Sequence, residues 1–145
     1  MTHIPAQSSN TIHKAAAIII KDRKLLVERS PGRGKNVWIA PGGKLEPGEN
    51  HQQALIRELR EELGIDVSLQ NTRFFGQFSA EAANHPGYTV VMCIYYVDAW
   101  HGTIAAGSEV EELVWVTTTD IGGLPMGSIF VHDVMPRLVA EGLLD

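Results

Sequence analysis

The chain contains a single cysteine, Cys93, so it cannot form an intramolecular disulfide. Cys93 lies within an apolar run, which favours a buried thiol that packs as a small hydrophobic side chain. No run of roughly 18 apolar residues is present, which argues against a membrane-spanning helix. Residues 1–10 are polar and have no basic-then-apolar signal pattern. These absences predict a cytoplasmic protein with a flexible arm over residues 1–10 and no membrane partner.

Positive charge is also scarce, because 12 lysines and arginines are outnumbered by 17 aspartates and glutamates, for a formal net charge of −5. This balance argues against nonspecific nucleic-acid binding, which requires a basic surface. It does not argue against a nucleotide ligand, because divalent cations mediate contacts between carboxylates and polyphosphates. We therefore expect a small-molecule partner and no nucleic-acid partner.

Repeats, low-complexity blocks and linkers are absent, and 44% hydrophobic content over 145 residues suits one compact domain, here residues 11–145. Strands are expected at 13–20, 24–28, 66–69, 74–80, 88–97 and 113–117, and a short extended piece at 38–40. The second of them should pair with the first across the turn at 21–23. Helices are expected from about residue 50 to 63 and from 128 to 142, with Pro136 either in an early turn after an Asp133 cap or at a kink. This order predicts an α/β fold in which helices cover both faces of a mixed sheet.

The most specific segment, Gly43–Ile65, reads GKLEPGENHQQALIRELREELGI. Asn50, with Gln53 three residues later, predicts a capping box at the start of a helix. Gly64 predicts a left-handed stop after Leu63, with an apolar contact from the residue that follows. The apolar stripe that must face a core consists of Leu55, Ile56, Leu59 and Leu63.

Three carboxylates, Glu58, Glu61 and Glu62, share a separate arc of this helix at positions i, i+3 and i+4. They repel one another, so a positive group should compensate them. Pairing of Arg57 with Glu61 would give an ordinary solvated, salt-bridged face. The preceding glycine-rich loop favours another interpretation, because it places backbone carbonyls beside hard carboxylate oxygens. Such donors are typical of Mg²⁺ or Mn²⁺ sites.

The spacing of this segment resembles the Nudix box, G-x5-E-x7-R-E-U-x-E-E-x-G-U with U a bulky aliphatic residue. Every fixed position is matched, by Gly43, Glu49, Arg57-Glu58-Leu59, Glu61-Glu62 and Gly64-Ile65. The resemblance implies an α/β/α sandwich with a mixed β-sheet. It also implies a metal-dependent hydrolase of nucleoside diphosphates linked to another group.

The resemblance further implies roles for single residues. Glu58, Glu61 and Glu62 would bind Mg²⁺, with Mn²⁺ as a substitute, together with the backbone carbonyl of Gly42. Arg57 would orient a glutamate through a salt bridge. Glu49 would hold the loop or contribute to the metal site through water.

A glutamate on a loop far downstream of the box joins the metal site in MutT-like members of the family. The matching place here is the acidic segment 107–112, just before the strand expected at 113–117. Glu109 and Glu112 are the best candidates for this role, and Glu111 remains open. An ordinary acidic loop is the alternative.

Candidate substrate contacts lie outside the box, and each has an ordinary structural alternative. Basic residues in and beside the loop before the box could hold phosphate oxygens rather than being merely solvated: Arg29, Arg33 and Lys35. Trp38 and Tyr88 offer flat faces to a nucleobase, whereas Phe78 suits core packing better. Asp120 could read a purine edge or cap a turn. The scattered His85, His101 and His132 show no metal spacing.

The sequence therefore predicts a pyrophosphohydrolase that converts a nucleoside triphosphate, oxidised or noncanonical ones included, to a monophosphate and pyrophosphate. The run GRGKNVW-x2-PGGKLEPGE looks like MutT-type enzymes. A dinucleotide polyphosphate or a nucleotide sugar is the close alternative. A nucleotide-sensing Nudix module without catalysis is the alternative from another class, although the box keeps all its carboxylates. The oligomeric state, monomer or homodimer, stays open.

Overall fold

The computed structural model describes residues 10–29, 38–82, 85–121, 126–127 and 129–145. One sheet has the strand order β4 (Gly42–Lys44), β1 (Thr11–Ile18), β6 (Thr89–Val97) and β5 (Thr72–Glu81). It is mixed, because β1 runs parallel to β6 while the other neighbours are antiparallel. The second sheet is antiparallel and consists of β2 (Ile20–Lys21), β3 (Lys24–Arg29) and β7 (Glu112–Val116).

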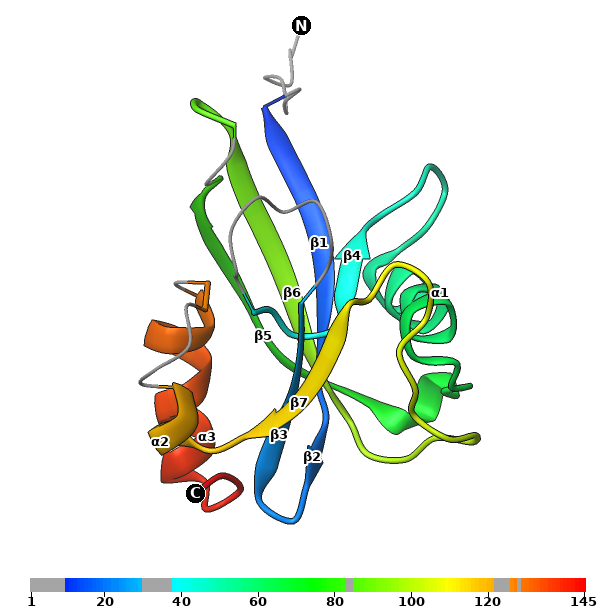
Figure 1. Ribbon diagram of the computed structural model, residues 1–145. Helices are drawn as coiled ribbons and strands as arrows, with labels where there is room; N and C mark the ends of the chain where they lie inside the picture. Colours follow the sequence, from blue (N-terminus) through cyan, green and yellow to red (C-terminus); the bar gives the residue numbers. More distant parts are fainter. Residues whose placement is uncertain (1–9, 30–37, 83–84, 122–125, 128) are drawn as a thin grey trace, which may run out of the picture.

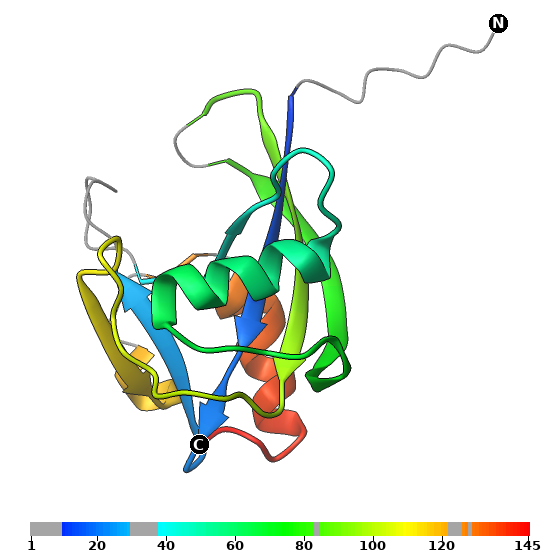
Figure 2. The same cartoon turned by 90° about the vertical axis from the view of Figure 1, so that its right-hand side faces the viewer.

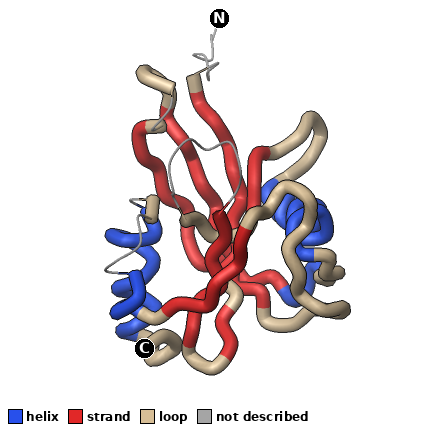
Figure 3. The backbone as a smooth tube through the Cα atoms, in the orientation of Figure 1, coloured by secondary structure: helices blue, strands red, loops and turns tan. Residues whose placement is uncertain are grey.

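Helices flank these strands on two sides (Figures 1 and 3). On one side α1 (His51–Leu63) crosses the strands, as Figure 2 shows face-on. On the other side lie α2 (Thr118–Ile121), the π-helical turn η2 (Phe130–Val134) and α3 (Met135–Ala140). A short 3₁₀ turn, η1 (Leu69–Asn71), leads into β5. The expected α/β sandwich with a mixed sheet is confirmed.

The strands separate two cores, because alternate residues of a strand point to opposite faces. One face of β1, with Ala15 and Ala17, packs with Leu26 and the buried leucines of α1, which are Leu55, Leu59 and Leu63. The other face, with Ala16 and Ile18, packs with the C-terminal helices through Phe130, Val134 and Leu138. Alternate residues of β1 therefore face α1 on one side and the C-terminal helices on the other.

Two strand predictions need correction. The first expected strand divides at Ile19 into β1 and β2. As a result β3 pairs with β2, with Ile20 opposite Leu25 and Lys21 opposite Lys24, rather than with β1. The segment 66–69 is not a strand, because no strand lies beside it in the described residues. Only an isolated bridge joins Asp66 to His101 before η1 begins.

The C-terminal segment is helical as predicted, but the start of its helix differs from the prediction. Pro136 lies in the first turn of α3, directly after the π-helical turn, where a missing N–H costs little. Val134 occupies the N-cap position and no side chain caps the helix, so the Asp133 cap is wrong. Ser128 and the arm predicted for residues 1–10, apart from Asn10, lie outside the described residues.

Candidate active site

The box helix α1 is fixed at both ends by the residues the sequence indicated. The side chain of Asn50 accepts a hydrogen bond from the Gln53 amide at 2.8 Å, and Gln53 Oε1 accepts one from the Asn50 amide at 2.9 Å. Gly64 ends the helix in the left-handed region, with φ of 70°. These caps and the buried leucine stripe define which side chains α1 presents to the neighbouring β4 edge.

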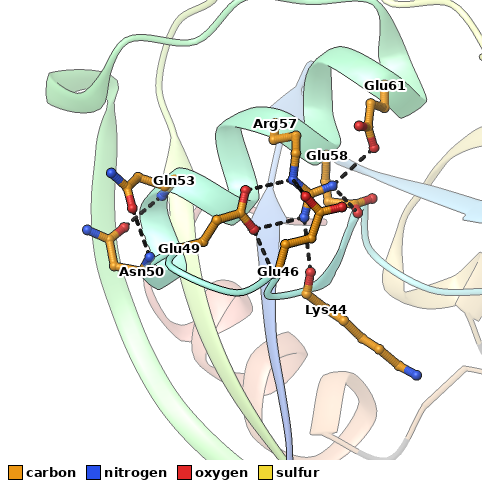
Figure 4. A network of polar contacts seen from close by, with 8 residues as sticks. All are labelled: Lys44, Glu46, Glu49, Asn50, Gln53, Arg57, Glu58 and Glu61. Atoms are coloured by element: carbon orange, nitrogen blue, oxygen red, sulfur yellow. Dashed lines mark hydrogen bonds and ion pairs between the residues drawn. The ribbon is translucent and has the colours of Figure 1, made fainter.

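Arg57 lies at the centre of the carboxylate face (Figure 4). Its guanidinium donates to both oxygens of Glu49, at 2.7 and 3.0 Å. A single nitrogen, Nη1, donates both to Glu58 at 2.9 Å and to Glu61 at 3.1 Å. The hydrogen bonds from Arg57 and from the Glu46 amide lower the pKa of Glu49. Arg57 thus contacts three glutamates of the box, Glu49, Glu58 and Glu61.

The same arginine ties the preceding loop to the helix. Arg57 Nη2 donates to the carbonyl of Lys44 at 3.1 Å, and Glu49 accepts from the Glu46 amide at 2.8 Å. Glu49 therefore holds the loop through direct hydrogen bonds, which is the first of its two predicted roles.

The glycines of β4 allow α1 to approach the sheet edge closely. The amide of Gly42 donates to Glu62 Oε1 at 3.0 Å. A Cβ on Gly43 would lie 2.6 Å from the carboxyl carbon of Glu58, and one on Gly42 would lie 2.0 Å from the carbonyl oxygen of Ala15. No side chain fits at either position without displacing its neighbours, so the carboxylates lie directly against the backbone of β4.

A residue that the sequence analysis missed completes this side. Glu28 of β3 is fully buried, with 0% of its surface exposed, and its carboxyl interacts with that of Glu62. Burial, followed by the interaction with the Glu28 carboxyl, raises the pKa of Glu62 to about 10. Glu28 lies two residues after Leu26, whose side chain packs with the α1 leucines, so strand alternation places both side chains on the face toward α1.

The donor set fits a hard divalent cation. Glu58, Glu61 and Glu62 supply carboxylate oxygens beside the backbone of Gly42. Burial raises the pKa of Glu58, although the hydrogen bond from Arg57 opposes this shift. The guanidinium of Arg57 already bridges Glu58 and Glu61 as a cation would. Among the described residues no three acidic, histidine or cysteine side chains converge as a ready-made ligand set.

The three glutamates downstream of the box, Glu109, Glu111 and Glu112, make different contacts. Arg29 donates to Glu111 at 2.8 Å and to Glu112 at 2.9 Å, and Arg29 and Glu112 are cross-strand neighbours. Leu113, the next residue, packs with the α1 core, so Glu112 lies on the face of β7 away from α1. Glu109 is exposed in the turn that follows Gly107. The Gly107 amide donates to the backbone of Glu62 at 2.8 Å, which places this loop against α1.

A pocket of about 390 Å³ opens on the opposite face of the mixed sheet. Its apolar walls come from β1, β6, the segment before the box and the start of η2, and they include Ile12, Ala16, Val90, Met92, Trp38 and Phe130. Gly42 and Gly43 also line it. The pocket and the carboxylate face therefore meet at β4.

The predicted substrate residues occupy different places. Trp38 is buried and lines the pocket. Tyr88 packs against His85, with 5.5 Å between ring centroids, and His85 also lines the pocket. Asp120 accepts from the Thr117 amide at 2.9 Å and so caps its own turn. The charge of Arg29 is compensated by its two glutamates. Arg33 and Lys35 lie outside the described residues.

Comparison with known proteins places these features in a family. The NUDIX domain profile matches residues 11–138. The CTP pyrophosphohydrolase of Escherichia coli (strain K12) is 35% identical over 118 residues, which cover 79% of this chain and 82% of the relative. The 8-oxo-dGTP diphosphatase of Proteus vulgaris is 43% identical over 60 residues, or 39% of this chain and 54% of the relative.

A solved structure gives the same result. The E. coli ORF135 protein superposes with a TM-score of 0.76 at 32% identity, covering 97% of this chain and 99% of that one. The chain belongs to the Nudix family and is a Nudix hydrolase, an enzyme class that acts on phosphoanhydride bonds. Nudix hydrolases in general require divalent cations. In the described part of the chain, no helix has the length and apolar character needed to cross a bilayer.

Proposed function

We propose that this enzyme hydrolyses a nucleoside triphosphate to a nucleoside monophosphate and pyrophosphate, with Mg²⁺ held at α1. The observation that carries the proposal is the position of β4 between two different surfaces. Gly42 and Gly43 line the pocket on one side and lie against Glu62 and Glu58 on the other. A ligand whose flat apolar part fills the pocket would direct its phosphates across these glycines toward the carboxylates.

The pocket suits a nucleobase in size and chemistry. Its volume of about 390 Å³ lies in the usual range for small-molecule sites, and apolar side chains dominate its walls. Trp38 adds an indole ring, and His85 and Glu81 add polar groups toward the outer end. The names of two relatives support a triphosphate substrate, since one acts on CTP and another on 8-oxo-dGTP.

The metal would be held by Glu58, Glu61, Glu62 and the carbonyl of Gly42, with Mn²⁺ as a substitute for Mg²⁺. Bound there, it would lower the pKa of a coordinated water and offset charge on the phosphates. Arg57 keeps Glu58 and Glu61 on one side of the helix, and Glu49 keeps Arg57 in place. Of the downstream glutamates we favour Glu109, because Glu111 and Glu112 are paired with Arg29.

Direct attack by water is favoured over a covalent intermediate. The only thiol, that of Cys93, is 5% exposed and faces the α1 core, and burial raises its pKa. A thiol in that position is a poor nucleophile, because the thiolate is the reactive form. We therefore propose hydrolysis without a phosphoenzyme.

The proposals on domain extent, location and partners rest on the sequence. We propose a single catalytic domain over residues 11–145, a cytoplasmic location, and no nucleic-acid or membrane partner. The enzyme would act as a monomer or a homodimer.

The test is a panel of substrates incubated with Mg²⁺ in ¹⁸O-labelled water. The panel contains CTP, 8-oxo-dGTP, the ordinary triphosphates, a dinucleotide tetraphosphate, ADP-ribose and a nucleotide sugar. We expect turnover of at least one triphosphate, pyrophosphate as the first product, and label in one product only. Release of inorganic phosphate first, a labelled protein, or turnover confined to the last three compounds would refute the proposal. Tight nucleotide binding without turnover would indicate a sensing module instead.

A further inference from the structure

Two histidines from different elements meet at the start of α1. His13 of β1 and His51, the first residue of α1, have ring centroids 5.9 Å apart and ring planes inclined at 72°. His13 is exposed and His51 is half-buried. Ala15 and Ala17, two and four residues after His13, pack with the α1 leucines, so this contact lies on the α1 side of the sheet. The sheet therefore separates the histidines from the pocket.

The fold leaves one nitrogen of this pair without a partner. Nε2 of His51 is buried and has no hydrogen-bond partner among the described residues. A buried polar atom in this condition is costly, and an ion is one of the few things that explain it in a native fold. Neutral imidazole is the commonest protein ligand of metal ions, through a ring nitrogen of this kind. The nitrogen of His51 therefore points to an ion that accepts its lone pair.

The spacing of the two rings suits one ion between them. With a metal–nitrogen bond of about 2 Å, an ion lies about 3 Å from the centroid of a ligating ring. Two rings that share an ion then have centroids about 5–6 Å apart, and the observed 5.9 Å falls in that range. His13 is exposed, so its ring can turn to present a nitrogen while His51 stays in place.

The histidine pair is distinct from the carboxylates proposed to bind Mg²⁺. His51 precedes Glu58 by seven residues (51 to 58), which corresponds to roughly 10 Å along a helix. The ligands also differ in chemistry, because imidazole nitrogen suits Zn²⁺, Cu²⁺ and Ni²⁺ whereas Mg²⁺ prefers oxygen. The partial positive charge at the N-terminus of α1 opposes any cation, so both nitrogens are needed to hold one there.

We propose that His13 and His51 form a binding site for a transition-metal ion of the Zn²⁺ type, with water at its remaining coordination positions. The bound ion ties β1 to the first turn of α1. Because it binds an arrangement that exists only in the folded chain, it stabilises the protein by mass action. The site goes beyond the proposed hydrolysis and does not depend on it.

The test is a calorimetric titration of the untagged protein with Zn²⁺ in excess Mg²⁺, which keeps the carboxylates occupied. We expect at least about 100-fold weaker binding in His13→Gln and in His51→Gln, since even an outer-shell partner of a metal ligand is worth about 10–100-fold. Zn²⁺ should raise the midpoint of thermal unfolding in the unaltered protein and not in either variant. Cu²⁺ bound in place of Zn²⁺ should show two nitrogen ligands by electron paramagnetic resonance.

His132→Gln is the matched control, because His132 is exposed on η2 and the substitution removes one imidazole on the other side of the sheet. Its Zn²⁺ affinity should equal that of the unaltered protein. Unchanged binding in His13→Gln, an equal loss in the control, or Cu²⁺ with a single nitrogen ligand would overturn the site. If His51→Gln does not fold, His13→Gln decides the result, because it alters an exposed side chain. Hydrolysis of triphosphates with Mg²⁺ is measured separately, so failure of either proposal is recognised by itself.

Discussion

The carboxyls of Glu28 of β3 and Glu62 of α1 interact in the interior, at the point where the box helix lies against the second sheet. Two buried carboxyls in contact cannot both be ionised without a compensating cation, so the metal-free pair keeps a proton. A divalent cation at Glu62 would take the place of that proton. If the metal binds there as proposed, its binding would be coupled to proton release at this residue.

The first prediction concerns stability in the absence of metal. The pKa of Glu62 rises from 4.5 to about 10 on folding, so between these values the folded protein holds a proton that the unfolded chain has released. The free energy of unfolding should therefore fall as pH rises through this window. Thermal unfolding in chelator between about pH 6 and pH 9 tests the sign. Glu28→Gln should flatten the slope, since it removes the neighbouring acid. A midpoint that climbs with pH would contradict the coupling.

The second prediction concerns metal removal. Chelator should abolish turnover, because the metal proposed at Glu58, Glu61 and Glu62 is then lost, and in the described part of the chain Arg57 contacts two of them, Glu58 and Glu61. Stability should fall less than activity, since caps and leucines hold α1 independently of the metal. Adding Mg²⁺ back should restore turnover and release protons in weakly buffered solution. Full activity in chelator would exclude the metal mechanism.

The third prediction compares the carboxylates. Glu62→Gln should lower turnover more than any other single change in the box, on the order of 10²–10⁴, because it removes a ligand charge and the contact to the Gly42 amide. Glu61→Gln and Glu58→Gln should come close behind, and Arg57→Ala should cost less because its role is orientation. Steady-state rates at saturating Mg²⁺ decide the order. Near-normal turnover of Glu62→Gln would mean that the carboxylates form only a solvated face.

The fourth prediction concerns the closeness of β4 to α1. In Gly43→Ala the new Cβ would lie 2.6 Å from the carboxyl carbon of Glu58, so this side chain must move and loosen its contact with Arg57. We expect a loss of about 1–3 kcal/mol in stability and a larger loss in activity. Adding Glu58→Asp shortens the obstructing side chain, so the double variant should regain stability without regaining activity. Denaturant unfolding of both variants provides the comparison, and an unaffected Gly43→Ala would disprove the steric argument.

Helix α1 was predictable because its signals are local. Asn50, Gln53, Gly64 and the leucine spacing determine its ends and its buried face within one segment. The strand expected at residues 66–69 failed for the opposite reason, because a strand needs a partner that the local sequence does not reveal.

Glu28 and the pocket could not be found from the sequence in the same way. Glu28 belongs to the site only because β3 turns that face toward α1, and its partner Glu62 lies 34 positions later (28 to 62). The pocket combines Ile12, Trp38, Met92 and Phe130, which are far apart in the chain. Nothing in their spacing indicates that they meet.

The three-residue strand β4 has a consequence for how this enzyme can be altered. It is the shared border between the pocket and the carboxylate face, and the two surfaces otherwise draw on different residues. If the base fills the pocket as proposed, substitutions at Ile12, Val90 or Met92 would change which base is accepted and leave the carboxylates of α1 in place. Choice of substrate and cleavage would then be separable tasks, divided by two glycines and a lysine, and redesign for a new nucleotide could leave the α1 carboxylates untouched.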